Sequence, residues 1–188
     1  MRLQKEKTSG MLHGKGLTYN VVPTLVNAAN YGVPQKRERV FIVGFRHDLG
    51  IQWSFPEARF WQDALVHDQW VTGEYWERHK VARKGRPKCP ASLDAKVRRM
   101  RDLLVPLDSA PWRTVRDALV GLPDPESRAA KELPDHKFQP GAKTYPGHTG
   151  SPLDAPAKTL KAGDHGVPGG ENMLVKPNGD VRYFTIRE

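Results

Sequence analysis

Residues 27–44 read NAANYGVPQKRERVFIVG and decide the fold of this 188-residue chain. Residues 40–45 are β-branched and aromatic, which predicts a buried strand. Residues 23–30 predict a second short strand, and residues 31–39, with a glycine, a proline and a run of charges, predict a turn. Strands joined this closely should be antiparallel neighbours, because a parallel pair needs a crossover of about a dozen residues or more.

Three helices are expected after this strand pair. Apolar side chains four residues apart predict the first, around residues 61–70. Ser92 is a candidate N-cap for a second helix over residues 93–104. The third is expected over residues 114–120, ended by Gly121.

The last third of the chain is irregular. Its apolar residues come in twos and threes rather than in periodic runs. Residues 174–175 and 181–186, separated by the turn sequence PNGD at 177–180, predict a closing hairpin. We therefore place a domain boundary near residue 123.

Composition excludes several classes of protein. No apolar run approaches the ~18 residues of a membrane span, and residues 1–7 lack the apolar core of a signal peptide. The single cysteine, Cys89, excludes a disulfide framework and a cysteine-built zinc site. With 30 Lys+Arg against 21 Asp+Glu, a net charge of +9 and 38% hydrophobic residues, we expect a soluble, cytoplasmic protein. The positive charge favours a polyanionic partner such as nucleic acid, against the alternative of a merely basic surface.

The residues with the clearest chemistry are Gln35, Arg37 and Arg39. In an extended backbone Arg37 and Arg39 point the same way, because side chains alternate along a strand. Two parallel guanidinium groups beside a glutamine amide suit phosphate oxygens or the edge of a base. From the residues alone, the alternative is a solvated run of charges at a turn.

Aromatic and histidine residues favour structural roles. Aromatic side chains at helical spacing are typical of a core rather than of a base-stacking surface. They are Trp61, Trp70, Tyr75 and Trp76. The histidines of the last third have no metal-binding spacing, so no metal site is expected.

Residues 27–44 resemble the Gln-x-Arg-x-Arg block of DNA (cytosine-5) methyltransferases, flanks included. More than 100 residues later, residues 156–163 (PAKTLKAG) resemble the Thr-Leu segment of that family's target recognition domain. Residues 182–188 (RYFTIRE) resemble the opening of the block that follows it. Residues 114–123 are similar to the helix that commonly precedes the recognition domain.

The resemblance covers roughly residues 17–46 and 112–188, and residues 47–111 match nothing in the family's pattern. It implies an α/β fold. Residues 1–122 would be the C-terminal portion of a Rossmann-like methyltransferase domain, with the antiparallel strand pair, helices and a helical insertion. Residues 123–188 would be a small, irregular, β-containing target recognition domain, truncated at its end.

The family's mechanism, which the resemblance implies, flips a cytosine out of the duplex, because C5 and C6 are unreachable inside the stack. A cysteine thiolate adds to C6, a glutamic acid protonates N3, and C5 takes a methyl group from S-adenosylmethionine. By position, Arg39 is expected to hold the flipped base through its O2 edge, while Arg37 and Gln35 brace the pocket and a nearby phosphate. The residues expected to contact DNA from the recognition domain are Thr159, Leu160, Lys161, Gly163, His165, Gly169 and Gly170.

Parts of the family's machinery are missing from this sequence. The Pro-Cys nucleophile loop is absent, because Cys89 precedes a proline instead of following one. Nearby lysines and an arginine favour a lowered thiol pKa, but no catalytic role is expected for Cys89. The Glu-Asn-Val motif and the Phe-x-Gly-x-Gly loop that binds S-adenosylmethionine are absent too. The glycine-rich residues 163–170 follow no strand and fit a recognition loop better than a nucleotide cradle.

We therefore expect a part of a DNA (cytosine-5) methyltransferase that supplies recognition of double-stranded DNA and lacks activity alone. It would be a truncated product, or one part of a split enzyme whose second chain carries the nucleophile and cofactor motifs. The alternatives are a non-catalytic, sequence-specific DNA-binding module and a basic globular domain with no nucleic-acid role. Complementation by a second chain separates the first two, and absence of duplex binding at low salt favours the third.

Overall fold

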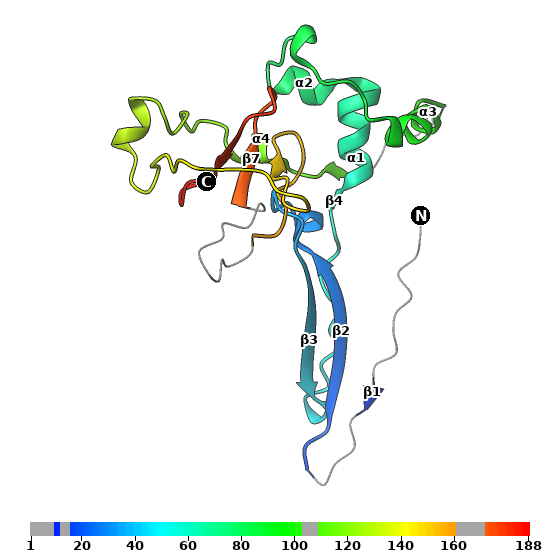
Figure 1. The fold of residues 1–188 in the computed structure, drawn as a ribbon. Helices are drawn as coiled ribbons and strands as arrows, with labels where there is room; N and C mark the ends of the chain where they lie inside the picture. The colour runs from blue at the N-terminus through cyan, green and yellow to red at the C-terminus, as the bar shows by residue number, and fades with distance from the viewer. Residues whose placement is uncertain (1–9, 12–15, 103–108, 161–171) are drawn as a thin grey trace.

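The computed structural model describes residues 10–11, 16–102, 109–160 and 172–188. Two antiparallel strands, β2 (Tyr19–Asn27) and β3 (Glu38–Arg46), form a long ribbon that projects away from the other described elements (Figure 1). The short strand β1 (Gly10–Met11) pairs with the outer edge of β2. The predicted antiparallel pair is confirmed, although β2 begins earlier and ends earlier than the pattern indicates. No strand of the described residues pairs with the outer edge of β3.

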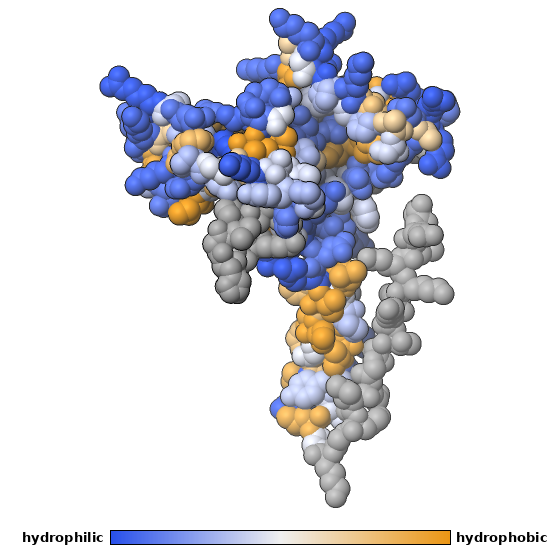
Figure 2. All heavy atoms as spheres, in the orientation of Figure 1, coloured by the Kyte–Doolittle hydropathy of each residue, from blue (hydrophilic) through white to orange (hydrophobic). Residues whose placement is uncertain are grey.

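One face of the ribbon is apolar and exposed, which corrects the prediction of a buried strand. Leu25 lies opposite Val40 in the ladder, and Ile42 is the next residue of β3 on the same face. These three side chains are 57%, 63% and 71% exposed. Figure 2 shows hydrophobic surface along the projecting ribbon. On the opposite face, Phe41 packs against Phe55 at a ring-centroid distance of 5.5 Å and is 45% exposed.

A tight turn connects the ribbon to the core of the molecule. Asn27 caps the 3-10 helix η1 (Ala28–Tyr31) by accepting a hydrogen bond from the N–H of Ala29, which is fully buried. Gly32 ends this helix with a φ of 84°, and a Cβ at that position would lie 2.8 Å from the Phe60 ring. Both the backbone conformation and the close approach therefore require glycine here.

The part of the chain after residue 58, which we call the head, contains short helices and two small sheets. Strand β4 (Phe60–Trp61) pairs in parallel with β5 (Ala110–Pro111). The helical segments between and after them are, in chain order, α1 (Gln62–His67), the π-helical η3 (Asp68–Thr72), α2 (Glu74–Arg78), the 3-10 helices η4 (Arg83–Gly85) and η5 (Ala91–Leu93), α3 (Asp94–Asp102) and α4 (Val115–Ala118).

Helices form close to where the sequence predicts them, with differences at their ends. Trp61 lies in β4 and is 46% exposed, so it does not extend the apolar face of α1. Ser92 lies inside η5 and does not cap α3, because a 3-10 turn precedes that helix. Thr114 caps α4 through a reciprocal capping box with Asp117, and this first turn explains the helix start.

The core of the head is built on aromatic side chains. Tyr75 and Trp76 are buried with Ala29, Leu65 and Trp112, which confirms the core prediction for the aromatic pair of α2. A second cluster joins α1 to α3 through Val66, Val97 and Met100. No helix among the described residues is long and apolar enough to cross a membrane.

The C-terminal part forms a three-stranded sheet. Strand β7 (Met173–Val175) pairs in parallel with β6 (Ser151–Pro152) and antiparallel with β8 (Val181–Tyr183), which confirms the predicted hairpin. A 3-10 helix, η6 (Ala129–Glu132), precedes it in the chain. The mixture of an antiparallel pair, helices and a small β-containing part agrees with the expected fold class.

Candidate nucleic-acid interface

The arginine segment, residues 34–39, lies where the ribbon joins the head (Figure 1). Gln35 forms a parallel bridge with Ala157. The N–H of Ala157 donates to the carbonyl of Pro34, and the N–H of Lys36 donates to the carbonyl of Ala157, both at 2.8 Å. The hydroxyl of Thr159 donates to the carbonyl of Lys36 at 2.6 Å. The two sequence blocks that carry the family resemblance therefore contact each other in space.

The two arginines of the segment present exposed guanidinium groups. Arg37 and Arg39 are exposed, and neither forms an ion pair with a carboxylate of the described residues. Arg39 is the second residue of β3, and its Nη1 donates to the adjacent carbonyl of Glu38. Lys36 points the other way, with its Nζ 5.5 Å from the centre of the Trp112 ring. This surface can accept phosphate oxygens or a base edge without first breaking an ion pair.

The expected DNA contacts of the recognition region are only partly described by the structure. Thr159 is half-buried, with its hydroxyl engaged by the arginine segment, and Leu160 is 47% exposed. The remaining expected contacts lie outside the described residues. They are Lys161, Gly163, His165, Gly169 and Gly170.

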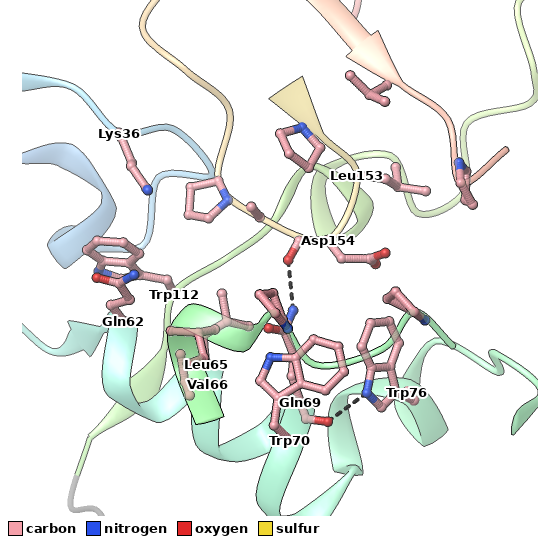
Figure 3. Close-up of a pocket in the computed structure, with 18 of the residues that line it drawn as sticks. Lys36, Gln62, Leu65, Val66, Gln69, Trp70, Trp76, Trp112, Leu153 and Asp154 are labelled. Atoms are coloured by element: carbon pink, nitrogen blue, oxygen red, sulfur yellow. Dashed lines mark hydrogen bonds between the residues drawn. The ribbon is translucent and has the colours of Figure 1, made fainter. Parts of the chain in front are cut away.

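A cavity of about 380 Å³ lies behind the arginine segment, between α1, η3 and residues 152–156 (Figure 3). Its walls are mainly apolar and include Trp70 and Trp112. Lys36 reaches one side of it, and Asp154 is the single carboxylate among the described residues that line it. The exposed arginines of the segment do not line this cavity, so it is separate from the candidate interface.

The head contains a polar cluster that the sequence analysis does not predict. Asp154 accepts hydrogen bonds from Arg116 and from the hydroxyl of Tyr75, which also contacts the hydroxyl of Thr114. Burial raises the pKa of the Tyr75 hydroxyl, and the pKa of Arg116 is raised by its bond to Asp154. These residues are far apart in the sequence, so no spacing signals the cluster. Only the Thr-x-x-Asp capping pattern at residues 114–117 marks part of it.

Cys89 occupies a structural position. It packs against the cluster of Val66, Val97 and Met100. Burial raises the pKa of its thiol, and Asp94 raises it further, which corrects the expectation that neighbouring cations lower it. The thiolate is the reactive form of cysteine, so this thiol is poorly suited to nucleophilic attack at neutral pH.

We expect Cys89→Ser to leave duplex affinity within twofold of the parent chain, because the side chain packs against Val66, Val97 and Met100 in the head. Iodoacetamide should alkylate Cys89 in the folded chain at pH 7.5 several-fold more slowly than N-acetylcysteine. Mass spectrometry over a time course measures both rates. Alkylation faster than the free thiol would contradict the raised pKa.

Comparison with known proteins supports the family resemblance. The C-5 cytosine-specific DNA methylase family matches residues 6–102, just over half of the chain. This match includes most of residues 47–111, which the family's motifs left unplaced, and it stops before the recognition blocks. No solved structure matches the chain.

Several type II methyltransferases are similar to shorter stretches. M.NgoPII of Neisseria gonorrhoeae is 50% identical over 48 residues, which is 26% of this chain and 14% of the relative. M.HhaI of Haemophilus parahaemolyticus is 42% identical over 60 residues, which is 29% of this chain and 18% of the relative. M.FnuDI of Fusobacterium nucleatum is 62% identical over 54 residues, which is 25% of this chain and 16% of the relative. The chain spans less than a fifth of the length of each of these relatives.

Proposed function

Since the chain belongs to the C-5 cytosine-specific DNA methylase family, we propose that it supplies target recognition for a DNA (cytosine-5) methyltransferase. That enzyme would transfer a methyl group from S-adenosylmethionine to C5 of a flipped cytosine. Double-stranded DNA is the proposed partner of this chain. The chain alone is proposed to lack activity, because its one cysteine is partly buried against the cluster of Val66, Val97 and Met100 and its thiol pKa is raised.

The pairing of Gln35 and Lys36 with Ala157 and Thr159 supports this proposal most directly. Residues resembling the base-binding block and residues resembling the recognition domain are 123 positions apart at Lys36 and Thr159, yet they share hydrogen bonds. A protein that must place one base in a pocket while reading its neighbours needs these two functions at a fixed separation. The contact provides that fixed separation.

In this proposal Arg39 binds the flipped pyrimidine, and Arg37 and Gln35 brace the pocket and a nearby phosphate. Arg39 is suited to this role because its guanidinium is exposed and forms no ion pair with a described carboxylate. A planar guanidinium can donate two parallel hydrogen bonds to a base edge. Thr159, Leu160 and residues 161–170 would face the duplex from the recognition side.

The described residues do not fit S-adenosylmethionine. The cavity of Figure 3 is mainly apolar, and its carboxylate, Asp154, is already bonded to Arg116 and Tyr75, so it is not free to bind ribose hydroxyls. Among the described residues, neither long strand leads into a glycine-rich turn, since β2 continues into η1 and β3 into the 3-10 helix η2 (His47–Leu49). We propose that the cofactor binds to another part of the enzyme.

A second chain, or a further segment of the enzyme, would carry the nucleophile and cofactor motifs. The exposed apolar face of the ribbon around Leu25, Val40 and Ile42 supports this part of the proposal. Apolar side chains grouped on one sheet face are typical of a surface that packs against another element. The free outer edge of β3 within the described residues offers a place for a neighbouring strand.

The test is a complementation assay with the purified 188-residue chain. Its partner is the catalytic part of a related type II methyltransferase, such as M.NgoPII, from which the segment matching this chain has been deleted. Tritiated methyl transfer from S-adenosylmethionine to duplex DNA is measured for each chain alone and for the mixture. The matched control is the same partner with its nucleophilic cysteine replaced by serine. We expect transfer only from the mixture that contains the intact cysteine.

Two outcomes would count against the proposal. Methyl transfer by the 188-residue chain alone would contradict a part that lacks catalytic activity. Failure of the mixture, with duplex binding retained by the chain, would favour the second candidate, a DNA-binding module that transfers no methyl group. Exposed Lys80, Lys84 and Lys88, which form no ion pair with described carboxylates, are compatible with that module. Both candidates predict salt-dependent duplex binding.

A further inference from the structure

Residues 151–159, which we call the strap, link the arginine segment to the helices of the head. The strap is a closed loop, because the hydroxyl of the buried Ser151 accepts a hydrogen bond from the N–H of Lys158 at 3.0 Å. One side of this loop contacts α4 and the helices before it. The other side contacts residues 34–36.

Asp154 fixes the middle of the strap. Its Oδ1 accepts from the Tyr75 hydroxyl at 2.8 Å and from Arg116 Nε at 2.6 Å, and its Oδ2 accepts from Arg116 Nη2 at 3.1 Å. Its main-chain carbonyl accepts from the side-chain amide of Gln69 at 2.7 Å (Figure 3). Charge-assisted bonds of this kind are roughly twice as strong as neutral ones. The carboxylate is therefore held from two directions.

The neighbouring carbonyls of the strap are held by the first turn of α4. Leu153 accepts from the N–H of Arg116 at 2.8 Å, and Ala155 accepts from the N–H of Val115 at 3.0 Å. These donors belong to the start of a helix, where N–H groups have no partner within the helix. Helix α4 thus fixes the backbone on both sides of Asp154.

Tyr75 connects this region to the aromatic core. Its ring is fully buried and packs edge-on against Trp76 at a centroid distance of 4.8 Å. Because burial raises the pKa of its hydroxyl, the proton stays on the oxygen and is donated to Asp154. The Tyr75 side chain therefore connects α2 directly to the strap.

The far side of the strap holds the arginine segment through backbone groups alone, apart from the Thr159 hydroxyl. Ala157 binds on both sides of Gln35, through Pro34 and Lys36. A displacement of Asp154 would move Ala157, three residues away in a closed loop. Arg37 and Arg39 are held on the other side by the ribbon, since the carbonyl of Arg37 accepts from the N–H of Ala28 and Arg39 pairs with Val26. The contact with Ala157 therefore sets where the recognition region lies relative to these arginines.

We propose that Tyr75 and Asp154 are positioning residues that fix the arginine segment relative to the recognition region. This assigns a role to the helices at residues 62–78, for which the sequence offered no motif. The helices support the strap, and the strap fixes the recognition region relative to the base-binding arginines. The consequence for methyl transfer rests on the proposed function, whereas the consequence for the segment itself does not.

The test compares the full chain with Tyr75→Phe, which removes one hydroxyl and keeps the buried ring. Amide hydrogen exchange is followed by NMR on the ¹⁵N-labelled chain. We expect the amides of Lys36 and Ala157 to exchange about tenfold faster in the variant, because a buried bond to a charged group is lost. Amides of the β2–β3 ladder should stay within twofold of the parent chain.

Tyr145→Phe is the matched control, because Tyr145 is 49% exposed and takes part in none of the strap hydrogen bonds described above. It should leave the exchange rates of the Lys36 and Ala157 amides and of the β2–β3 ladder amides unchanged. Asp154→Asn is the second variant, for use if Tyr75→Phe folds poorly. It should also speed the hydrogen exchange of the Lys36 and Ala157 amides. Equally faster exchange of all amides, or unchanged exchange at Lys36 and Ala157, would overturn the proposal. Either result would show that Tyr75 contributes only to the packing of the core.

The complementation assay provides a second readout. There Tyr75→Phe should lower kcat with KM for the duplex unchanged, since the DNA-contacting side chains are intact but misplaced. A raised KM with kcat unchanged would instead indicate a lost DNA contact and would overturn the positioning role. If the mixture shows no methyl transfer, the exchange experiment still decides the proposal, so the two failures are distinguishable.

Discussion

Arg39→Ala is expected to lower methyl transfer in the complemented enzyme by roughly a thousandfold, about the loss that follows removal of one preorganised donor from an active site. Arg39 is exposed at the start of β3 and binds only a neighbouring carbonyl, so its removal breaks no ion pair among the described residues. The substitution should therefore leave the melting temperature of the chain unchanged. Tritiated methyl transfer measures the activity, and circular dichroism measures the stability.

Two matched variants sharpen this prediction. Arg46→Ala removes another exposed arginine from the other end of the same strand, where it pairs with Asp48, and should retain full activity. Arg39→Lys keeps the charge but loses the planar pair of donors, and should recover little of the lost activity. Equal activity of Arg39→Lys and the parent chain would show that Arg39 acts only as a point charge near a phosphate.

The sequence predicts the ribbon well but not its exposure. The β-branched run at residues 40–45 correctly indicates a strand, and the short turn correctly indicates an antiparallel partner. Burial depends on what covers the strand, and that information lies elsewhere in the chain or outside it. Phe41 packs against Phe55 and is 45% exposed, while Ile42, its neighbour in the sequence, is 71% exposed. A continuous apolar run cannot distinguish these two faces.

The candidate site divides in the same way. The arginine segment was predictable, because residues 34–39 carry a contiguous motif. The contacts that hold it were not, because Thr159 reaches Lys36 across 123 residues and Asp154 reaches Tyr75 across 79. Such hydrogen bonds follow no periodicity, and helix propensity does not encode them. The Cys89 thiol pKa was mispredicted for a related reason, since burial and Asp94 outweigh the cations that are near in sequence.

Ile42→Asp is expected to abolish complementation while leaving the free chain folded. If the apolar face of the ribbon packs against the catalytic part of the enzyme, the substitution removes a buried side chain worth about 1.5–3 kcal/mol and places an unpaired carboxylate in the interface. Together these effects should weaken assembly by more than about 100-fold. In the free chain Ile42 is 71% exposed, so the free energy of unfolding should change by less than about 1 kcal/mol.

Val120→Asp is the matched control, because Val120 is also 71% exposed but lies beyond α4 in the head. It should complement as well as the parent chain. Sedimentation velocity of the mixture measures assembly, and methyl transfer measures its consequence. Light scattering of the chain alone offers an independent check, because an exposed apolar strand face promotes self-association. Ile42→Asp should lower that scattering and Val120→Asp should not, whereas equal complementation by the two variants would show that the catalytic part binds elsewhere.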